Sequence, residues 1–69
     1  MKITLFSWNN RYLIKLEQGL LEQTYKVDQF DILNEDELLK LIDADFIQQA
    51  QKRFLEMSIS LRDAKIRLG

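Results

Sequence analysis

The chain has 69 residues, of which 46% are hydrophobic and 30% charged, and its formal net charge is −1. It contains no cysteine and no histidine, which excludes disulfides, thiolate or imidazole metal sites, and Ser-His or Cys-His catalytic pairs. A chain this short has room for one small core, so we expect a single domain over residues 1–69. A partner chain is then a common source of additional stability.

The charges are unevenly distributed along the chain. Residues 1–16 carry three cations and no acid, residues 17–46 carry nine acids and two cations, and residues 47–69 carry five cations and two acids. The three sums, +3, −7 and +3, suit contacts within the fold or between chains and provide no strong attraction to nucleic acid. Because no apolar run has the length of a signal peptide or a membrane span, we expect a cytoplasmic protein without a membrane partner.

The first half of the chain has the two-residue period of β-strands. Between positions 11 and 17, the side chains of Tyr12, Ile14 and Leu16 fall on one face, and all three charged side chains fall on the other together with Leu13. Residues 21–27 alternate in the same way, and residues 2–8 align with the second run through a short turn. The pattern predicts three strands near residues 2–8, 11–17 and 20–28.

Two short turns connect these strands and set their pairing. Asn9-Asn10 suits a two-residue turn because asparagine tolerates a left-handed backbone. Gln18-Gly19 suits another because glycine adopts a positive φ without strain, and a four-residue loop over 17–20 would keep the same pairing. The predicted pairs are Lys2 with Glu17, Ile3 with Leu16, Thr4 with Lys15, Leu5 with Ile14, Phe6 with Leu13, Ser7 with Tyr12 and Trp8 with Arg11 in the first hairpin, and Leu16 with Leu21, Lys15 with Glu22, Ile14 with Gln23, Leu13 with Thr24 and Tyr12 with Tyr25 in the second.

These pairings place most of the apolar side chains on one face of a three-stranded meander. We expect the helices that follow to cover this face. Its apolar members are Ile3, Leu5, Ile14, Leu16, Leu21, Tyr25 and Val27.

From residue 34 the period changes to that of a helix. Asn34 can cap a short helix over residues 35–43, with Glu37 as the capping-box partner. Asp43 or Ala44-Asp45 begins a long helix over residues 44–67. Its main apolar stripe has heptad spacing, and we expect the part up to Met57 to pack on the sheet. The stripe consists of Ile47, Ala50, Phe54, Met57, Leu61, Ala64 and Leu68.

The C-terminal half of the long helix carries more apolar surface than one sheet can cover. Leu55, Ile59 and Ile66 form a second stripe, and the helix is longer than the strands. We therefore predict that Leu55, Ile59, Leu61, Ile66 and Leu68 contact another chain. Alternatively, the cations of this helix touch an acidic partner or RNA, or simply form a solvated face; they are Arg53, Arg62, Lys65 and Arg67.

The outer face of the sheet is the second candidate surface. Phe6, Trp8, Arg11 and Leu13 cluster there, and aromatic and arginine side chains are favoured at protein interfaces. The same cluster, with cations around it, could stack on single-stranded RNA, although the charge makes nucleic acid an unlikely partner. In a third interpretation Phe30, Ile32 or a helix folds over this face and makes a secondary core.

Signals for catalysis are weak. Glu35, Asp36 and Glu37 are explained by the positive end of a helix dipole, and residues 43–54 lack the glycine and the final glutamate of a calcium loop. We expect no enzyme activity, cofactor, metal or small-molecule substrate. The sequence thus predicts an α+β domain of β-β-β-α-α order that acts as a small interaction module and self-associates as a dimer.

Overall fold

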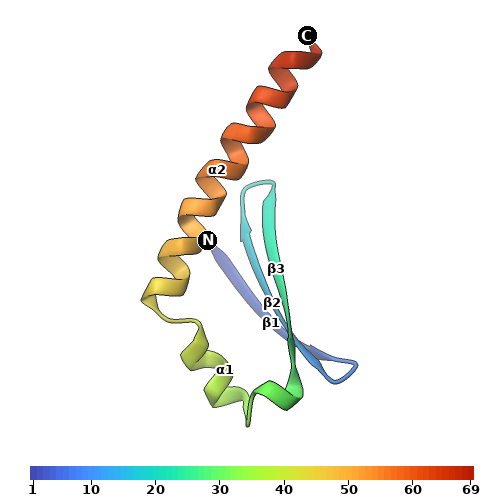
Figure 1. The fold of residues 1–69 in the computed structure, drawn as a ribbon, viewed down its shortest axis with the longest axis vertical. Coiled ribbons are helices and arrows are strands. Elements are labelled where there is room, and N and C mark those ends of the chain that lie inside the picture. Colours follow the sequence, from blue (N-terminus) through green and yellow to red (C-terminus); the bar gives the residue numbers. More distant parts are fainter.

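The computed structural model describes all of residues 1–69 and confirms an α+β fold of β-β-β-α-α order (Figure 1). Its elements are strands β1 (Lys2–Trp8), β2 (Arg11–Gln18) and β3 (Leu21–Asp28), a 3-10 turn (Gln29–Asp31), helix α1 (Glu35–Leu41) and helix α2 (Ala44–Leu68). The strands form one antiparallel sheet in the order β1-β2-β3.

The register of the first hairpin is confirmed at every pair. Ile3 lies opposite Leu16 and Leu5 lies opposite Ile14. The turn residues Asn9 and Asn10 have φ values of 54° and 63°, the pair of positive angles that a type I′ turn requires. Asparagine adopts this backbone at lower cost than most residues, so the turn holds the two strands in register.

The predicted register of the second hairpin is wrong by two residues. The turn is Gly19-Leu20 rather than Gln18-Gly19, and Gly19 has the positive φ (61°) at the first turn position, as in a type II′ turn. A shift of two residues leaves the same side chains on each face. The observed pairs are Gln18 with Leu21, Glu17 with Glu22, Leu16 with Gln23, Lys15 with Thr24, Ile14 with Tyr25, Leu13 with Lys26, Tyr12 with Val27 and Arg11 with Asp28.

Lys15 explains how this register tolerates two glutamates opposite each other. Glu17 and Glu22 form a cross-strand pair, and like charges there are destabilising. The Lys15 ammonium lies 3.3 Å from Glu22 and 4.0 Å from Glu17. The expected Lys15–Glu22 attraction therefore exists as a diagonal contact, not as the predicted direct pair.

Side-chain caps define the starts of both helices. Asn34 accepts a hydrogen bond from the Glu37 backbone N–H (3.0 Å), and Asp43 accepts one from the Phe46 N–H (2.8 Å). Glu37 in turn accepts from the Leu33 N–H (2.8 Å). Because Asp43 is extended and caps α2, α1 ends at Leu41, two residues earlier than predicted.

The core lies between the sheet and the helices, which are on the same side of the sheet (Figure 1). Tyr25, Phe46 and Met57 are among the half-buried side chains around it, and the Tyr25 and Phe46 rings pack with centroids 5.3 Å apart. The buried residues are Ile14, Leu16, Ile32, Leu38, Ala50 and Phe54.

Helix α2 is longer than the surface on which it packs. Its 25 residues span about 37 Å, against about 27 Å for an eight-residue strand. Its C-terminal part projects past the turn between β2 and β3, and the molecule is 49 Å long (Figure 1). No helix of the fold has the length and apolar character that crossing a membrane requires.

Candidate interaction surfaces

The helix-facing side of the sheet is covered over β2 and β3 but is open over β1. Ile14 and Leu16 are 0% exposed, whereas their cross-strand neighbours Leu5 and Ile3 are 37% and 38% exposed. Of the three strands, β3 packs most closely against α2. The apolar core therefore ends abruptly at β1, although this strand presents side chains of the same kind to the same side.

A cavity of about 140 Å³ marks this opening. It lies between β1 and α1, where Leu5 and Ser7 face Leu38 and Leu39. Leu38 is buried and Leu39 is exposed, so α1 covers β1 only in part. Phe6, Tyr12 and Glu35 complete the lining.

Polar contacts hold α2 against β3 on the opposite flank. Arg53 donates through Nε to the Gln23 carboxamide oxygen (3.0 Å) and through an Nη atom to the Tyr25 hydroxyl (2.7 Å). The Gln23 amide nitrogen donates to the Ala50 carbonyl (2.9 Å). These bonds keep the helix over β3 and leave β1 uncovered.

The second apolar stripe of α2 lies on the flank of the helix opposite to Arg53. Leu55, Ile66 and Ile59 are rotated by about 100°, 120° and 140° around the axis from Phe54, in the direction opposite to Arg53. All three side chains are exposed. Leu55, Ile59 and the open core face of β1 are therefore unpartnered apolar surfaces, whereas Ile66 also borders a groove beside Leu21 of β3.

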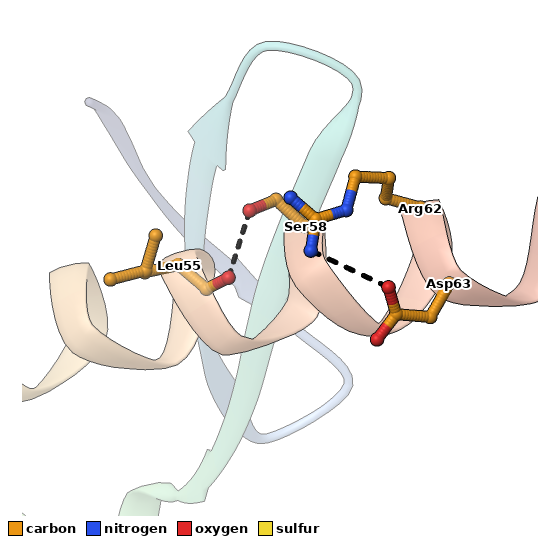
Figure 2. Close-up of polar contacts among 4 residues, drawn as sticks. All are labelled: Leu55, Ser58, Arg62 and Asp63. Atoms are coloured by element: carbon orange, nitrogen blue, oxygen red, sulfur yellow. Dashed lines mark hydrogen bonds and ion pairs between the residues drawn. The ribbon is translucent and has the colours of Figure 1, made fainter.

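The polar side chains along this stripe bond within the helix. Figure 2 shows the Ser58 hydroxyl donating to the Leu55 carbonyl (2.8 Å) and Arg62 paired with Asp63 (3.4 Å). Neither contact connects the C-terminal half of α2 to the sheet. A shallow groove of about 430 Å³ separates this half from the turn between β2 and β3, where Leu20 and Leu21 face Leu61 and Ile66.

The outer face of the sheet is uncovered. Phe30 is 92% exposed, and Ile32 belongs to the core on the helix side, so neither makes the secondary core considered from the sequence. Trp8 is 69% exposed, and Phe6 is also exposed. The face also carries four cations and three acids: Lys2, Arg11, Lys15, Lys26, Glu17, Glu22 and Asp28.

The structure brings the predicted outer-face residues together, since Phe6 pairs with Leu13 and Trp8 with Arg11. Of the predicted helix residues, Leu61 borders the groove on the main stripe, and Leu68 is exposed at the far end of α2.

The prediction that the helices cover Ile3 and Leu5 of β1 is wrong, since both side chains are exposed. Whether β1 is covered depends on where α2 sits across the sheet, and the alternation of side chains along the strands does not specify this position.

No group of three or more acidic side chains is close enough to share a metal ion. Glu35, Asp36 and Glu37 lie in the first turn of α1, where Glu37 completes the cap. The chain matches no family model, no curated protein and no solved structure.

Proposed function

We propose that the protein is a non-catalytic interaction module that associates with a second copy of itself. The observation that carries this proposal is the unfinished core, in which Ile3 and Leu5 are exposed beside the fully buried Leu16 and Ile14. Apolar surface of this kind is stabilised when another chain removes it from water. We expect a dimer that acts in the cytoplasm.

The charge distribution supports a second copy as the partner. The −7 segment (residues 17–46) and the +3 segment (residues 47–69) of one chain complement the same segments of another chain that runs in the opposite direction. Helix α2 begins near the acids of α1 and ends with Lys65 and Arg67. Two antiparallel copies would bring these opposite charges toward each other.

Sedimentation equilibrium of the purified chain tests this proposal. We expect a dimer at tens of micromolar and weaker association of Ile59→Glu, because a carboxylate on the second stripe would have to lose its water. The dissociation constant should rise by at least about tenfold, which corresponds to about 1.4 kcal/mol. Ile66→Glu should act in the same direction.

Ser60→Glu is the matched control. Ser60 is exposed, neighbours Ile59 and lies on the other flank of α2, so the same charge should leave the dissociation constant within about twofold. A wild-type chain that remains strictly monomeric at tens of micromolar would disprove the proposal.

The charge of the outer face disfavours binding of single-stranded nucleic acid there. Trp8 and Phe6 are accessible, as stacking on bases requires. The four cations of the outer face are nearly balanced by Glu17, Glu22 and Asp28, so that face carries only +1. Phosphate contacts depend on a surplus of positive charge that this face lacks.

A further inference from the structure

We propose that β1 pairs antiparallel with β1 of a second copy, so that two three-stranded sheets join into one six-stranded sheet. This inference rests on the proposed function, because it names the surface through which the chain associates with itself. The surface is the free edge of β1 together with the core-side residues Ile3 and Leu5.

The edge of β1 lacks the features that normally prevent pairing. It is a strand of seven residues with one neighbour, and it contains no proline and no interruption of its register. Lys2 is its only charged residue and lies at its beginning. A long, regular edge strand with free N–H and C=O groups is a ready template for another strand.

Two-fold symmetry keeps the two core faces on the same side. Around such an axis, positions i and j pair so that i + j is even, which means that core-side residues always oppose core-side residues. The apolar faces of both copies would therefore form one continuous surface. A strand of a different protein would match core-side residues with core-side residues only by coincidence, whereas a second copy of β1 does so by symmetry.

The register centred on Leu5 pairs all seven residues of β1. Leu5 then lies opposite its own copy, and Ile3 lies opposite Ser7 of the second copy. A row of Ile14, Leu5, Leu5 and Ile14 would cross the junction and continue the core that stops at β1 in the single chain. The exposed Leu5 would thereby gain an apolar neighbour on its open side.

The outer face is electrostatically compatible with the same register. Trp8 lies opposite Lys2 of the second copy, where a cation can approach the indole ring. The row across the junction then reads Asp28, Arg11 and Trp8 of one chain, followed by Lys2, Glu17 and Glu22 of the other. No two like charges become direct neighbours at the junction.

The other edge of the sheet is less suited to this role. This edge is β3, and Arg53 and Phe46 of α2 pack against its side chains. The core-side residues of β3 are half-buried. β3 also carries Glu22, Lys26 and Asp28. Pairing at β1 would place the flank of α2 that carries Leu55 and Ile59 on the side of the junction, so Ile59→Glu is expected to weaken the dimer.

Disulfide trapping with the full chain tests this arrangement, because the chain has no cysteine of its own. In the register centred on Leu5, Thr4 lies opposite Phe6 of the second copy, with Cα atoms about 4.5–5.5 Å apart. This distance suits a disulfide, whereas two copies of Thr4 are a diagonal pair about 7–8 Å apart. Both positions are on the outer face, away from the core.

We expect a mixture of Thr4→Cys and Phe6→Cys chains to form the mixed disulfide dimer at least about tenfold faster than either variant alone under mild oxidation. Mass spectrometry identifies the mixed product. Thr24→Cys, near the centre of β3, is the control and should not cross-link.

The outcomes separate this inference from the proposed function. A dimer in sedimentation that cross-links through Thr24→Cys, or that does not cross-link in the Thr4→Cys and Phe6→Cys mixture, overturns pairing at β1 and leaves self-association standing. A strict monomer overturns both.

Discussion

Arg53 is the residue whose role differs most from its appearance in the sequence. Among the cations of the long helix it suggests a solvated face, yet it is half-buried and reaches both Gln23 and Tyr25. Its guanidinium carbon also lies 6.0 Å from the centre of the Tyr25 ring. The polar Gln23, on the core face of β3, is satisfied by this arginine and by the Ala50 carbonyl. Arg53 therefore determines where the helix sits on the sheet.

Replacing Arg53 with alanine should lower the free energy of unfolding by about 1–2 kcal/mol, because two hydrogen bonds between α2 and β3 are lost. Lys52→Ala is the matched control. Lys52 is the exposed neighbour, so its replacement should change the free energy by less than about 0.5 kcal/mol. Urea unfolding at one fixed protein concentration measures both. Equal effects would show that the Arg53 contacts do not stabilise the fold.

The apolar core was predictable from the sequence, but these polar contacts were not. Ile14, Leu16 and Phe54 fall at positions that the periods of strand and helix assign to the inside, and all three are buried. The partner of a long polar side chain depends on the rotation of α2 over the sheet, which the apolar pattern defines only within a broad stripe. Gln23 and Arg53, 30 residues apart, leave no local signal of their contact.

The two hairpins show what a local pattern can and cannot decide about an element. Asn9 and Asn10 occupy both turn positions, so the first register has one favourable solution, and it is confirmed. In the second hairpin, Gly19 suits either position of a two-residue turn. A shift of two residues leaves every side chain on the same face, so the alternation of apolar and polar residues does not reveal it. The faces were therefore predicted correctly, whereas the predicted pairs were wrong.

Gly19→Ala tests the turn at the level of the hairpin. An alanine Cβ would meet nothing within 4 Å, so the cost is that of a left-handed backbone for a residue with a side chain, about 1–2 kcal/mol of unfolding free energy. Asn10→Gly should instead raise the free energy of unfolding, because Asn10 has a φ of 63° and glycine adopts a positive φ without strain. Thermal unfolding by circular dichroism compares the two variants. A neutral Gly19→Ala would contradict the turn geometry.

At the scale of the whole molecule, burial decreases along α2. The N-terminal half is held by Ala50, Arg53 and Phe54, whereas no residue after Met57 is buried and no polar bond connects this half to the sheet. The sequence predicted that the long helix would extend beyond the ends of the strands. It could not show that β1 would also be left open, because coverage depends on the three-dimensional position of a single helix.

Hydrogen exchange should follow this gradient. In the Ile59→Glu variant, which we expect to be monomeric, amides after Met57 should be protected about tenfold less than those around Ala50 and Phe54. If the wild type forms the proposed dimer, the difference should shrink, because the second stripe is then partly covered. Uniform protection along α2 of the monomeric variant would contradict a free C-terminal half.

Only six of the 69 residues are buried, and this small number has a consequence for the protein in the cell. A chain that buries so few residues has a small stability of its own, so if it associates as proposed, its folded fraction rises with the concentration of its partner by mass action. If that partner is another copy, a larger fraction of the chains is unfolded and accessible to proteases at low protein concentration, and association protects the chains at high concentration. Turnover would then depend on expression level, and the unfinished core would act as a sensor of the protein's own abundance.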